Sequence, residues 1–219
     1  MNETSVRETK DRLLDVAERL FATQGIAATS LRQITTEAEV NLAAVNYHFQ
    51  SKDELVRSVY TRRLRPMNAI RLGRLDAMEA ENEEAAIDLN SLLCAFYEPV
   101  IDMAHALKNE GGVTIGQILG RIYTETHVIV EQLWLTEMAE VARRYTLALS
   151  RSLPHLKPEE VLWRFQFTIG ILAHTMAAEE KIMRITRGRI NLRDKEEVLR
   201  QMTSYAKAGL LAPTLEPTP

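Results

Sequence analysis

The stretch from Thr29 to Lys52, TSLRQITTEAEVNLAAVNYHFQSK, decides the fold of this chain because it predicts two short helices and the start of a third. Ser30 followed by Gln33 has the form of a capping box, in which a hydroxyl and a side-chain amide satisfy free backbone N–H groups at a helix start. Apolar residues then repeat at intervals of three and four. The first short helix is therefore expected over residues 31–39.

The second short helix of this stretch is expected over residues 42–49. Asn41 precedes it and is a favoured N-cap residue, because its side-chain oxygen can accept a bond from a free backbone N–H. Ser51 with Glu54 then forms another capping box. A third helix therefore opens directly after the second.

The helix over residues 42–49 has two unlike faces, because a helical turn takes 3.6 residues. Val45 and Phe49 lie on an apolar face, with Leu42 and His48 at its edges. The opposite face carries Ala43, Ala44, Asn46 and Tyr47.

This opposite face has the chemistry of a DNA reader. Alanines permit a close approach and contact thymine methyl groups, and an asparagine can bond adenine through N6 and N7. Tyr47, His48 and Lys52 can each donate to phosphate, and the helix start at Lys52 offers free N–H groups. The spacing therefore predicts a helix-turn-helix. Three small helices packed for stability, with Tyr47 and His48 as ordinary surface residues, remain an alternative reading of the same spacing.

Several linked segments between Lys10 and Leu55 resemble the DNA-binding domain of the tetracycline-repressor (TetR) family. They are RLFATQG (19–25), ATSLRQI (28–34), NLAAVNYHF (41–49) and SKDEL (51–55). The resemblance implies an all-α fold of roughly nine helices, with an N-terminal three-helix helix-turn-helix domain and a larger helical domain for ligand binding and dimerisation.

The resemblance also implies which residues meet double-stranded DNA. The phosphate contacts come from Thr29 or Ser30, Tyr47, His48 and Lys52, and the base-side positions are Arg32, Leu42, Ala43, Ala44 and Asn46, with Asn41 at the start of the reading helix. Asn46 stands where many relatives have Tyr, and Leu42 where many have a polar residue. The DNA sequence of the operator therefore cannot be inferred from that of a better-known member of the family.

Composition bounds the class of protein. The chain has 219 residues, of which 46% are hydrophobic and 26% charged, as in an ordinary soluble globular protein. Residues 1–65 hold 10 Lys or Arg against 9 Asp or Glu, so DNA contact must depend on where the charges sit. No leader and no apolar run of about 18 residues is visible, so we expect a cytoplasmic protein with no membrane partner.

Enzyme activity is not expected. The five histidines are scattered, none has a Glu three positions earlier, and no His-Glu-x-x-His occurs. The single cysteine excludes an internal disulfide and a thiolate cluster. We therefore expect no catalytic residue, no cofactor and no metal. The remaining alternative is a helical module that binds a small molecule without recognising DNA.

Helical periodicity extends over the whole chain. A frayed tail over residues 1–5 should lead into a first helix over 6–24, stopped by Gly25. The helix opened by Ser51 should kink or break at Pro66 and then resume. This places the boundary between a DNA-binding domain, residues 1–65, and an effector-binding and dimerisation domain, residues 66–219.

The second domain should consist of long apolar helices. They are expected over 87–107 with a bend at Pro99, from Val113 through Leu149, over 158–184 and over 194–210. The helix over 158–184 carries two apolar stripes, which implies burial against a partner subunit. The expected dimer contacts are Trp163, Phe167, Gly170 and His174, together with Val198, Met202 and Tyr205 on the last helix.

A small apolar effector should bind between these helices, as ligands commonly do in helical bundles. The candidate lining residues are Met67, Ile70, Phe96, Val100, Met103, Ile122, Trp134, Met138 and Phe165, and plain core packing is the alternative for each. The segments RRY (143–145), LPHLKPEEVLWRF (153–165) and GILAHTM (170–176) are similar to the PsrA-type branch of the family. That similarity implies a fatty acid or related acyl compound as effector.

Overall fold

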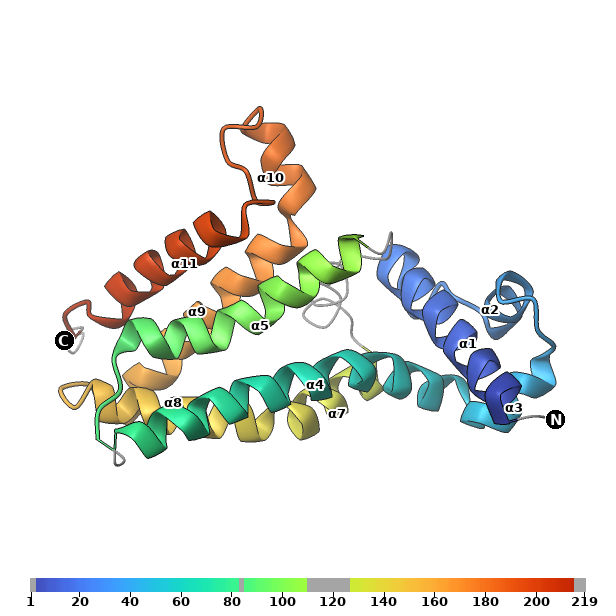
Figure 1. The fold of residues 1–219 in the computed structure, drawn as a ribbon, viewed down its shortest axis with the longest axis horizontal. Helices are drawn as coiled ribbons and strands as arrows, with labels where there is room; N and C mark the ends of the chain where they lie inside the picture. The colour runs from blue at the N-terminus through green and yellow to red at the C-terminus, as the bar shows by residue number, and fades with distance from the viewer. Residues whose placement is uncertain (1–2, 83–84, 110–126, 215–219) are drawn as a thin grey trace, which may run out of the picture.

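The computed structural model describes residues 3–82, 85–109 and 127–214, which form ten helices and no strand (Figure 1). The prediction of an all-α fold is confirmed. In chain order the helices are α1 Glu3–Gln24, α2 Leu31–Glu37, α3 Leu42–Phe49, α4 Lys52–Glu81, α5 Leu89–Asn109, α7 Val128–Glu137, α8 Ala139–Ser152, α9 Pro158–Ala177, α10 Glu179–Ile185 and α11 Lys195–Leu210. Within these residues, none of the helices combines the length and apolar character that a bilayer crossing requires.

Helices α1, α2 and α3 form a small unit at one end of the molecule (Figure 1). Helix α1 begins at Glu3, earlier than the predicted start at residue 6. It ends as predicted at Gly25, whose φ of 89° lies in the left-handed region that glycine adopts at little cost. Gly25 N–H donates to the Phe21 carbonyl at 3.0 Å.

Helix α4 is the long element that joins this unit to the rest of the chain, and it runs 30 residues without interruption. The predicted break at Pro66 is wrong. Pro66 is exposed, whereas its neighbours Leu64 and Met67 are buried. Packing of the inner face therefore holds the helix together where the missing N–H removes one backbone bond.

Two other helix boundaries also differ from the sequence prediction. The helix predicted to run through Leu149 is divided at Met138, where α7 ends and α8 begins, and the Met138 side chain is buried. The helix predicted over 158–184 is divided at Ala178, because α10 buries no side chain that would hold it in line with α9. Helix α5 continues through Pro99. The stretch 113–126 lies outside the described residues.

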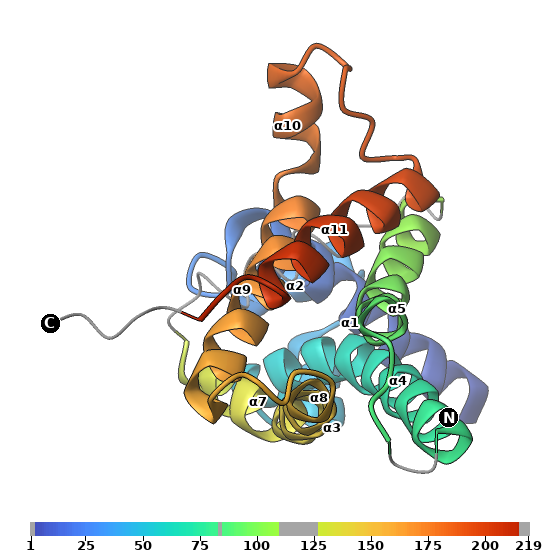
Figure 2. The same ribbon diagram turned by 90° about the vertical axis from the view of Figure 1, so that its left-hand side faces the viewer.

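The second domain packs α4, α5, α7, α8, α9 and α11 around one core, and α10 projects from this body (Figure 2). Four aromatic rings meet inside it. The ring centroid of Phe96 lies 5.1 Å from that of Tyr145 and 5.3 Å from that of Phe165. The Tyr97 hydroxyl donates to the Thr168 carbonyl at 3.0 Å. These contacts pack α5, α8 and α9 against one another.

Candidate nucleic-acid interface and effector cavity

Each of the three helices that follow Thr29 starts at a side-chain cap, as the sequence predicted. Ser30 Oγ accepts from Gln33 N at 3.1 Å, Asn41 Oδ1 from Ala44 N at 3.0 Å, and Ser51 Oγ from Glu54 N at 3.1 Å. These bonds fix the starts of α2, α3 and α4.

The Gln33 side chain does not complete the predicted capping box. Its Oε1 accepts from Gln24 Nε2 at 2.8 Å, and its Nε2 donates to Glu37 Oε1 at 3.1 Å. Gln33 therefore ties α2 to the end of α1 instead of returning to the backbone of Ser30. Arg19 on α1 also pairs with Glu37. Two links consequently hold α2 in place against α1.

The turn between α2 and α3 is longer than the sequence suggested, because α2 ends at Glu37 and not near Glu39. Glu39 takes a left-handed conformation with φ of 55°. Thr35 stabilises the turn from inside: its carbonyl accepts from Val40 N at 3.0 Å, and its buried hydroxyl donates to the Arg32 carbonyl at 3.0 Å. Helix α3 is thereby set at a defined angle to α2.

Helix α3 has two unlike faces as predicted, but Ala44 and Leu42 do not lie on the faces where the periodicity placed them. Val45 and Phe49 are 0% and 1% exposed and anchor the helix on the core. Its outer face presents Leu42, Ala43, Asn46 and Tyr47, all of them exposed. Ala44 is only half-buried and packs against the core. The outer face of α3 therefore carries mostly short side chains beside the phenol of Tyr47, and a face of this shape can enter a groove.

Thr29 does not lie where a phosphate ligand would lie. Its side chain is buried, its hydroxyl donates to the Gly25 carbonyl at 2.7 Å, and it accepts from Gln24 Nε2 at 3.1 Å. This residue therefore closes the turn after α1. Of the two residues named as alternatives for this phosphate contact, Ser30 is the exposed one.

Tyr47 and His48 lie together beside the start of α1. Their ring centroids are 5.0 Å apart, with the rings nearly perpendicular. Partial burial, followed by the positive charge of Lys10, lowers the pKa of His48 below its ordinary value. Lys10 Nζ also lies 5.8 Å from the centre of the Phe49 ring. Helix α1 thus adds a cation to the edge of this surface.

Lys52 is held in place by the protein itself. Its Nζ donates to the Ile26 carbonyl at 2.6 Å, and the residue is half-buried. An ammonium has three N–H donors, so this bond orients the group without excluding a phosphate. Arg32, by contrast, is exposed on α2.

A buried carboxylate joins α1 to α4. Glu18 has 6% of its side chain exposed. Its carboxylate accepts from Arg62 NH2 at 2.6 Å and from Nε and NH2 of Arg63, each at 2.9 Å. Arg62 also donates to Asp15 at 2.7 Å. Arg62 and Arg63 thus both bind carboxylates of the same chain. Sequence patterns gave no signal for this contact.

Helix α7 reaches back along α4 toward the helix-turn-helix. Arg65 forms a fork with Glu137 at 2.8–3.1 Å, and Asn68 Nδ2 donates to the Glu137 carbonyl at 2.7 Å. Nearer to the start of α4, Arg57 donates to Gln132 at 3.1 Å. These contacts tie α7 to α4 at three positions along its length.

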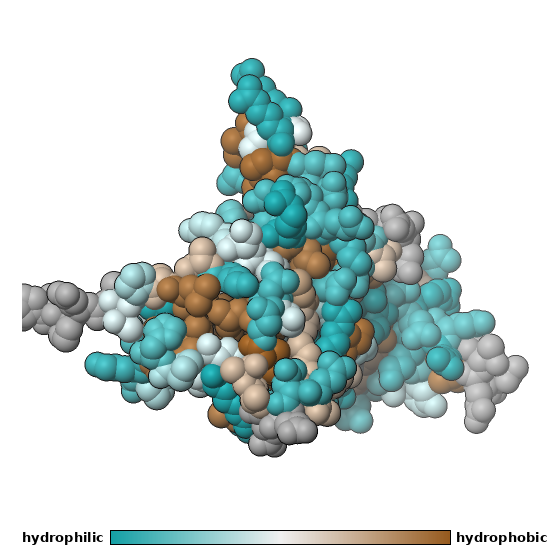
Figure 3. All heavy atoms as spheres, turned by 60° about the vertical axis from the view of Figure 1, so that its left-hand side comes forward, coloured by the Kyte–Doolittle hydropathy of each residue, from teal (hydrophilic) through white to brown (hydrophobic). Residues whose placement is uncertain are grey.

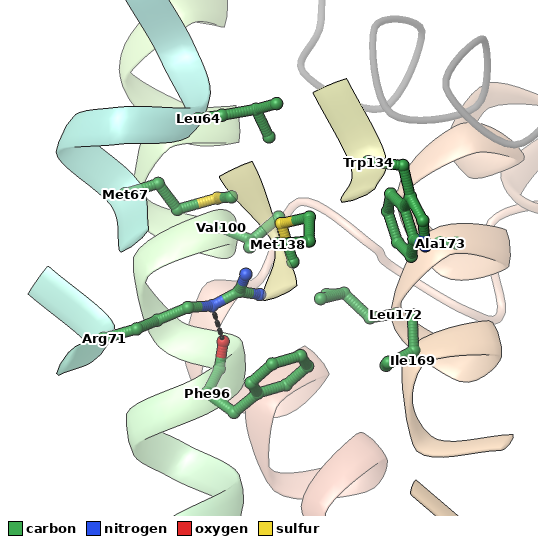
Figure 4. A pocket seen from close by; sticks show the side chains of 10 residues that line it. All are labelled: Leu64, Met67, Arg71, Phe96, Val100, Trp134, Met138, Ile169, Leu172 and Ala173. Carbon is green, nitrogen blue, oxygen red and sulfur yellow. Dashed lines mark hydrogen bonds between the residues drawn. The ribbon is translucent and has the colours of Figure 1, made fainter. Parts of the chain in front are cut away.

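A small cavity lies between α4, α5, α7 and α9 (Figure 4). Its volume is about 20 Å³, room for little more than one water molecule. Five of the predicted lining residues do line it: Met67, Phe96, Val100, Trp134 and Met138. It is completed by Leu64, Arg71, Ile169, Leu172 and Ala173, which the sequence prediction missed.

The other four predicted lining residues lie elsewhere or are not described. Ile70 is 47% exposed, so its assignment to the cavity is wrong; it precedes the buried Arg71 and faces solvent. Met103 packs at the edge of the core and is absent from the described lining. Phe165 lines a neighbouring groove. Ile122 lies outside the described residues.

The neighbouring groove opens to the surface between α7, α8 and α9 and measures about 260 Å³. Its outer part carries the exposed apolar residues Leu135 and Leu162. Four residues, Phe96, Trp134, Met138 and Ile169, line both the groove and the cavity. The two spaces are therefore adjoining parts of one apolar region.

The predicted dimer residues fall into two groups. Trp163, Phe167 and Tyr205 are 64%, 62% and 73% exposed, and Gly170 and His174 are also exposed. Figure 3 shows apolar surface gathered below the projecting α10 segment.

Val198 and Met202, by contrast, are 4% and 5% exposed within the single chain. Their assignment as primary dimer contacts is wrong, because this face of α11 packs against α5 and α9 and belongs to the core.

Two family models match the chain. Residues 94–209 match the model described as tetracyclin repressor-like, C-terminal domain, and residues 13–59 match bacterial regulatory proteins, tetR family. The HTH-type transcriptional regulator AcrR of Shigella flexneri is 41% identical over 54 residues, 25% of each chain. The HTH-type transcriptional repressor KstR2 of Rhodococcus jostii is 30% identical over 97 residues, 44% of this chain and 45% of KstR2. These matches thus span less than half of either relative.

Solved structures share the fold across nearly the whole chain. A TetR-like transcriptional regulator from Rhodococcus sp. RHA1 superposes with a TM-score of 0.62 at 15% identity, covering 94% of this chain and 97% of that one. SCO4454, a TetR-family transcriptional regulator from Streptomyces coelicolor, gives a TM-score of 0.58 at 18% identity, covering 93% and 95%.

Proposed function

The chain belongs to the tetracycline-repressor (TetR) family, whose members are transcriptional regulators and not enzymes, and we propose that it is a homodimeric repressor that a small apolar effector releases from DNA. The observation that carries this proposal is the outer face of α3. It combines small exposed side chains with Tyr47, and it is flanked by Ser30, His48 and Lys52.

Double-stranded DNA is the proposed partner of this face. Ala43 and Asn46 would meet base edges, and Leu42 would add apolar contact. Arg32, Ser30, Tyr47 and His48 would hold the phosphates on either side. Lys52 would reach phosphate with the N–H donors that point away from Ile26. The near-neutral charge of residues 1–65 makes these placed donors more important than overall attraction.

Dimerisation is proposed through the outer faces of α9 and α11. Trp163 and Phe167 are exposed neighbours with ring centroids 5.9 Å apart, and Tyr205 is exposed on α11. Large exposed aromatic residues of this kind are enriched at protein interfaces. A two-fold dimer would place two reading helices in successive major grooves, about 34–36 Å apart, and so require a pseudo-palindromic operator.

The effector would act by separating α7 from α4. The cavity holds about 20 Å³, so a ligand can enter only if the helices around it move apart. Helix α7 is bonded to α4 through Arg65 and Asn68. Helix α4 is in turn bonded to α1, because Arg63 on α4 donates to Glu18 on α1. Displacement would therefore change the spacing of the two reading helices. A ligand shifts this balance only by its difference in affinity for the two arrangements.

A fatty acid or acyl-CoA ester is the proposed effector class. The similarity of residues 133–178 to the PsrA-type branch supports it, and so does the predominantly apolar lining of the cavity and its groove. Elongated ligands need an extended apolar surface, which the adjoining groove provides.

A gel-shift titration with a matched pair of variants tests DNA recognition. The purified chain is titrated onto its own upstream DNA and onto sites selected from random DNA. Ala43→Glu puts a carboxylate on the outer face of α3 and should weaken binding at least about tenfold, the scale of one lost base contact. Ala80→Glu makes the same change at an exposed position of α4, remote from α3, and should bind like the parent.

Two results would count against this proposal. Equal binding by Ala43→Glu and the parent would remove α3 from the interface. The absence of any shift, on upstream and selected DNA alike, would favour a helical binding module that does not recognise DNA.

A further inference from the structure

Helix α10 and the segment after it form an arm that leaves the body of the molecule (Figure 2). Residues 178–193 are called the α10 arm below. Helix α10 has only 7 residues, and none of its side chains is buried. A helix this short is not stable in water unless it packs against another part of a protein. The described part of the chain does not supply that packing, so a further contact is expected.

The arm nevertheless has a defined shape. Gly188, at a left-handed φ of 75°, donates its N–H to the Met183 carbonyl at 2.9 Å and so ends the helix. At the base of the arm, Arg193 Nε lies 3.8 Å from Glu179 Oε1. This pair brings the two ends of the arm together. The arm is therefore preordered, which lowers the entropy cost of binding a partner.

The arm exposes large apolar side chains. Ile185 is 71% exposed and Ile190 is 47% exposed. Figure 3 shows apolar atoms on the projecting arm as well as on the body below it. Isolated exposed apolar residues are normal in soluble proteins, whereas an extended apolar patch marks an interaction surface. The question is therefore whether the arm continues the apolar surface of the body.

Two adjoining grooves connect the arm with the proposed dimer face on α9 and α11. The first measures about 360 Å³, and its lining includes Phe167, Ile171 and Tyr205. The second measures about 590 Å³; its lining includes Ile171 and Tyr205 again and extends to Ile190 on the arm. Phe167 in turn lies beside Trp163, with ring centroids 5.9 Å apart. The arm therefore continues the proposed dimer face.

The arm also differs in charge from the rest of the chain. Residues 178–193 hold five Lys or Arg against two Glu, a balance of +3. The whole chain has a net charge of −3, so the residues outside the arm carry −6. Two arms repel each other, whereas an arm and the body of a second copy attract each other. Charge therefore favours a dimer in which each arm lies on the partner's body and away from the partner's arm.

We propose that the α10 arm is a dimerisation arm that packs against the outer face of α9 and α11 in a second copy of the chain, with Ile185 and Ile190 as its apolar contacts. This inference rests on the proposed homodimer and adds a second element to its interface. A two-fold axis makes the contact reciprocal, so each protomer both gives and receives an arm. The exposed aromatic residues of α9 and α11 provide the receiving surface.

Sedimentation of the full chain over a range of concentrations measures the dissociation constant of the dimer. Ile185→Glu should raise this constant at least about tenfold, the scale of a residue that carries binding energy in an interface. Ile70→Glu is the matched control, because Ile70 is 47% exposed on α4, outside the proposed interface, and this variant should dimerise like the parent. Circular dichroism checks that each variant is folded.

Charge reversal on the arm tests the electrostatic part. Arg187 and Arg189 are exposed, so Arg187→Glu with Arg189→Glu leaves the body unchanged. This double variant should also weaken the dimer, and its difference from the parent should shrink as salt is raised, because salt screens exposed charges.

Hydrogen exchange of the unaltered chain tests burial of the arm without any substitution. Backbone amides of residues 179–190 should exchange more slowly at concentrations above the dissociation constant of the dimer than at concentrations below it, because the arm is covered only in the dimer. Amides around Ile70 should exchange at the same rate in both conditions.

The inference is overturned if Ile185→Glu dimerises as tightly as Ile70→Glu, or if the arm exchanges equally fast above and below the dissociation constant. Should Ile185→Glu fail to fold, the exchange of the unaltered chain decides alone. A chain that stays monomeric at every concentration would refute the proposed homodimer together with this inference. A dimer indifferent to the arm would refute only this inference, and binding of the parent but not of Ile185→Glu to phosphatidylglycerol vesicles would then assign the arm to a membrane surface.

Discussion

Replacing Glu18 by Gln tests the joint between the helix-turn-helix unit and α4. The Glu18 carboxylate is 6% exposed and accepts three hydrogen bonds from Arg62 and Arg63. Glutamine keeps the shape but loses the charge and turns one acceptor oxygen into an NH2 donor, so at least one of the three bonds is lost and the others weaken from roughly 1.5–3 kcal/mol toward roughly 0.5–1.5 kcal/mol. The variant should therefore lose about 3 kcal/mol of unfolding free energy, at the lower end for a broken buried pair.

Thermal unfolding followed by circular dichroism measures this loss. For a chain of this length, about 3 kcal/mol corresponds to a fall of roughly 6–12 °C in Tm. Asp15→Asn is the matched control, because Asp15 meets Arg62 at 2.7 Å from the same helix but is 66% exposed. Its loss should stay below about 1 kcal/mol. Equal falls in Tm for the two variants would refute the argument that burial makes the Glu18 contact strong.

Two further substitutions test local features of the DNA-binding unit. Gly25→Ala places a side chain at a φ of 89° and should lower the unfolding free energy by about 1–2 kcal/mol, measured by urea denaturation; an unchanged midpoint would contradict the left-handed stop. His48 has a lowered pKa in the folded chain, so the unfolded chain binds this proton more readily, and the contribution of His48 to stability is complete above about pH 6.5 and declines as pH falls below it. His48→Gln should therefore reduce the loss of stability between about pH 7 and pH 5, and an unchanged pH profile would contradict that sign.

Local sequence chemistry was sufficient to predict much of the DNA-binding unit. Asn41 and Ser51 cap their helices through bonds to residues three positions ahead, so the signal lies within one turn. Thr29 shows where this reasoning stops. Its type suits a phosphate contact, but the turn after Gly25 buries it and takes its hydroxyl for a backbone carbonyl.

The effector cavity could not be predicted from periodicity alone. Ile70 and Arg71 are adjacent, and one step along a helix rotates the side chain by about 100°. Hydropathy selects Ile70 for the interior, whereas the helices packed around α4 bury Arg71 and leave Ile70 exposed. Val198 and Met202 were misassigned for a similar reason. An apolar stripe predicts burial, but it does not tell whether the burying partner is α5 of the same chain or a second subunit.

The central claim is that occupation of the cavity controls the DNA-reading helices. Its most direct test is fluorescence anisotropy of a labelled operator, titrated with the unaltered chain with and without dodecanoate at a concentration that saturates the change in tryptophan fluorescence. The account predicts that dodecanoate raises the operator dissociation constant at least about fivefold, a typical lower limit for coupled sites. An unchanged dissociation constant, with the tryptophan fluorescence showing saturation by dodecanoate, would contradict it.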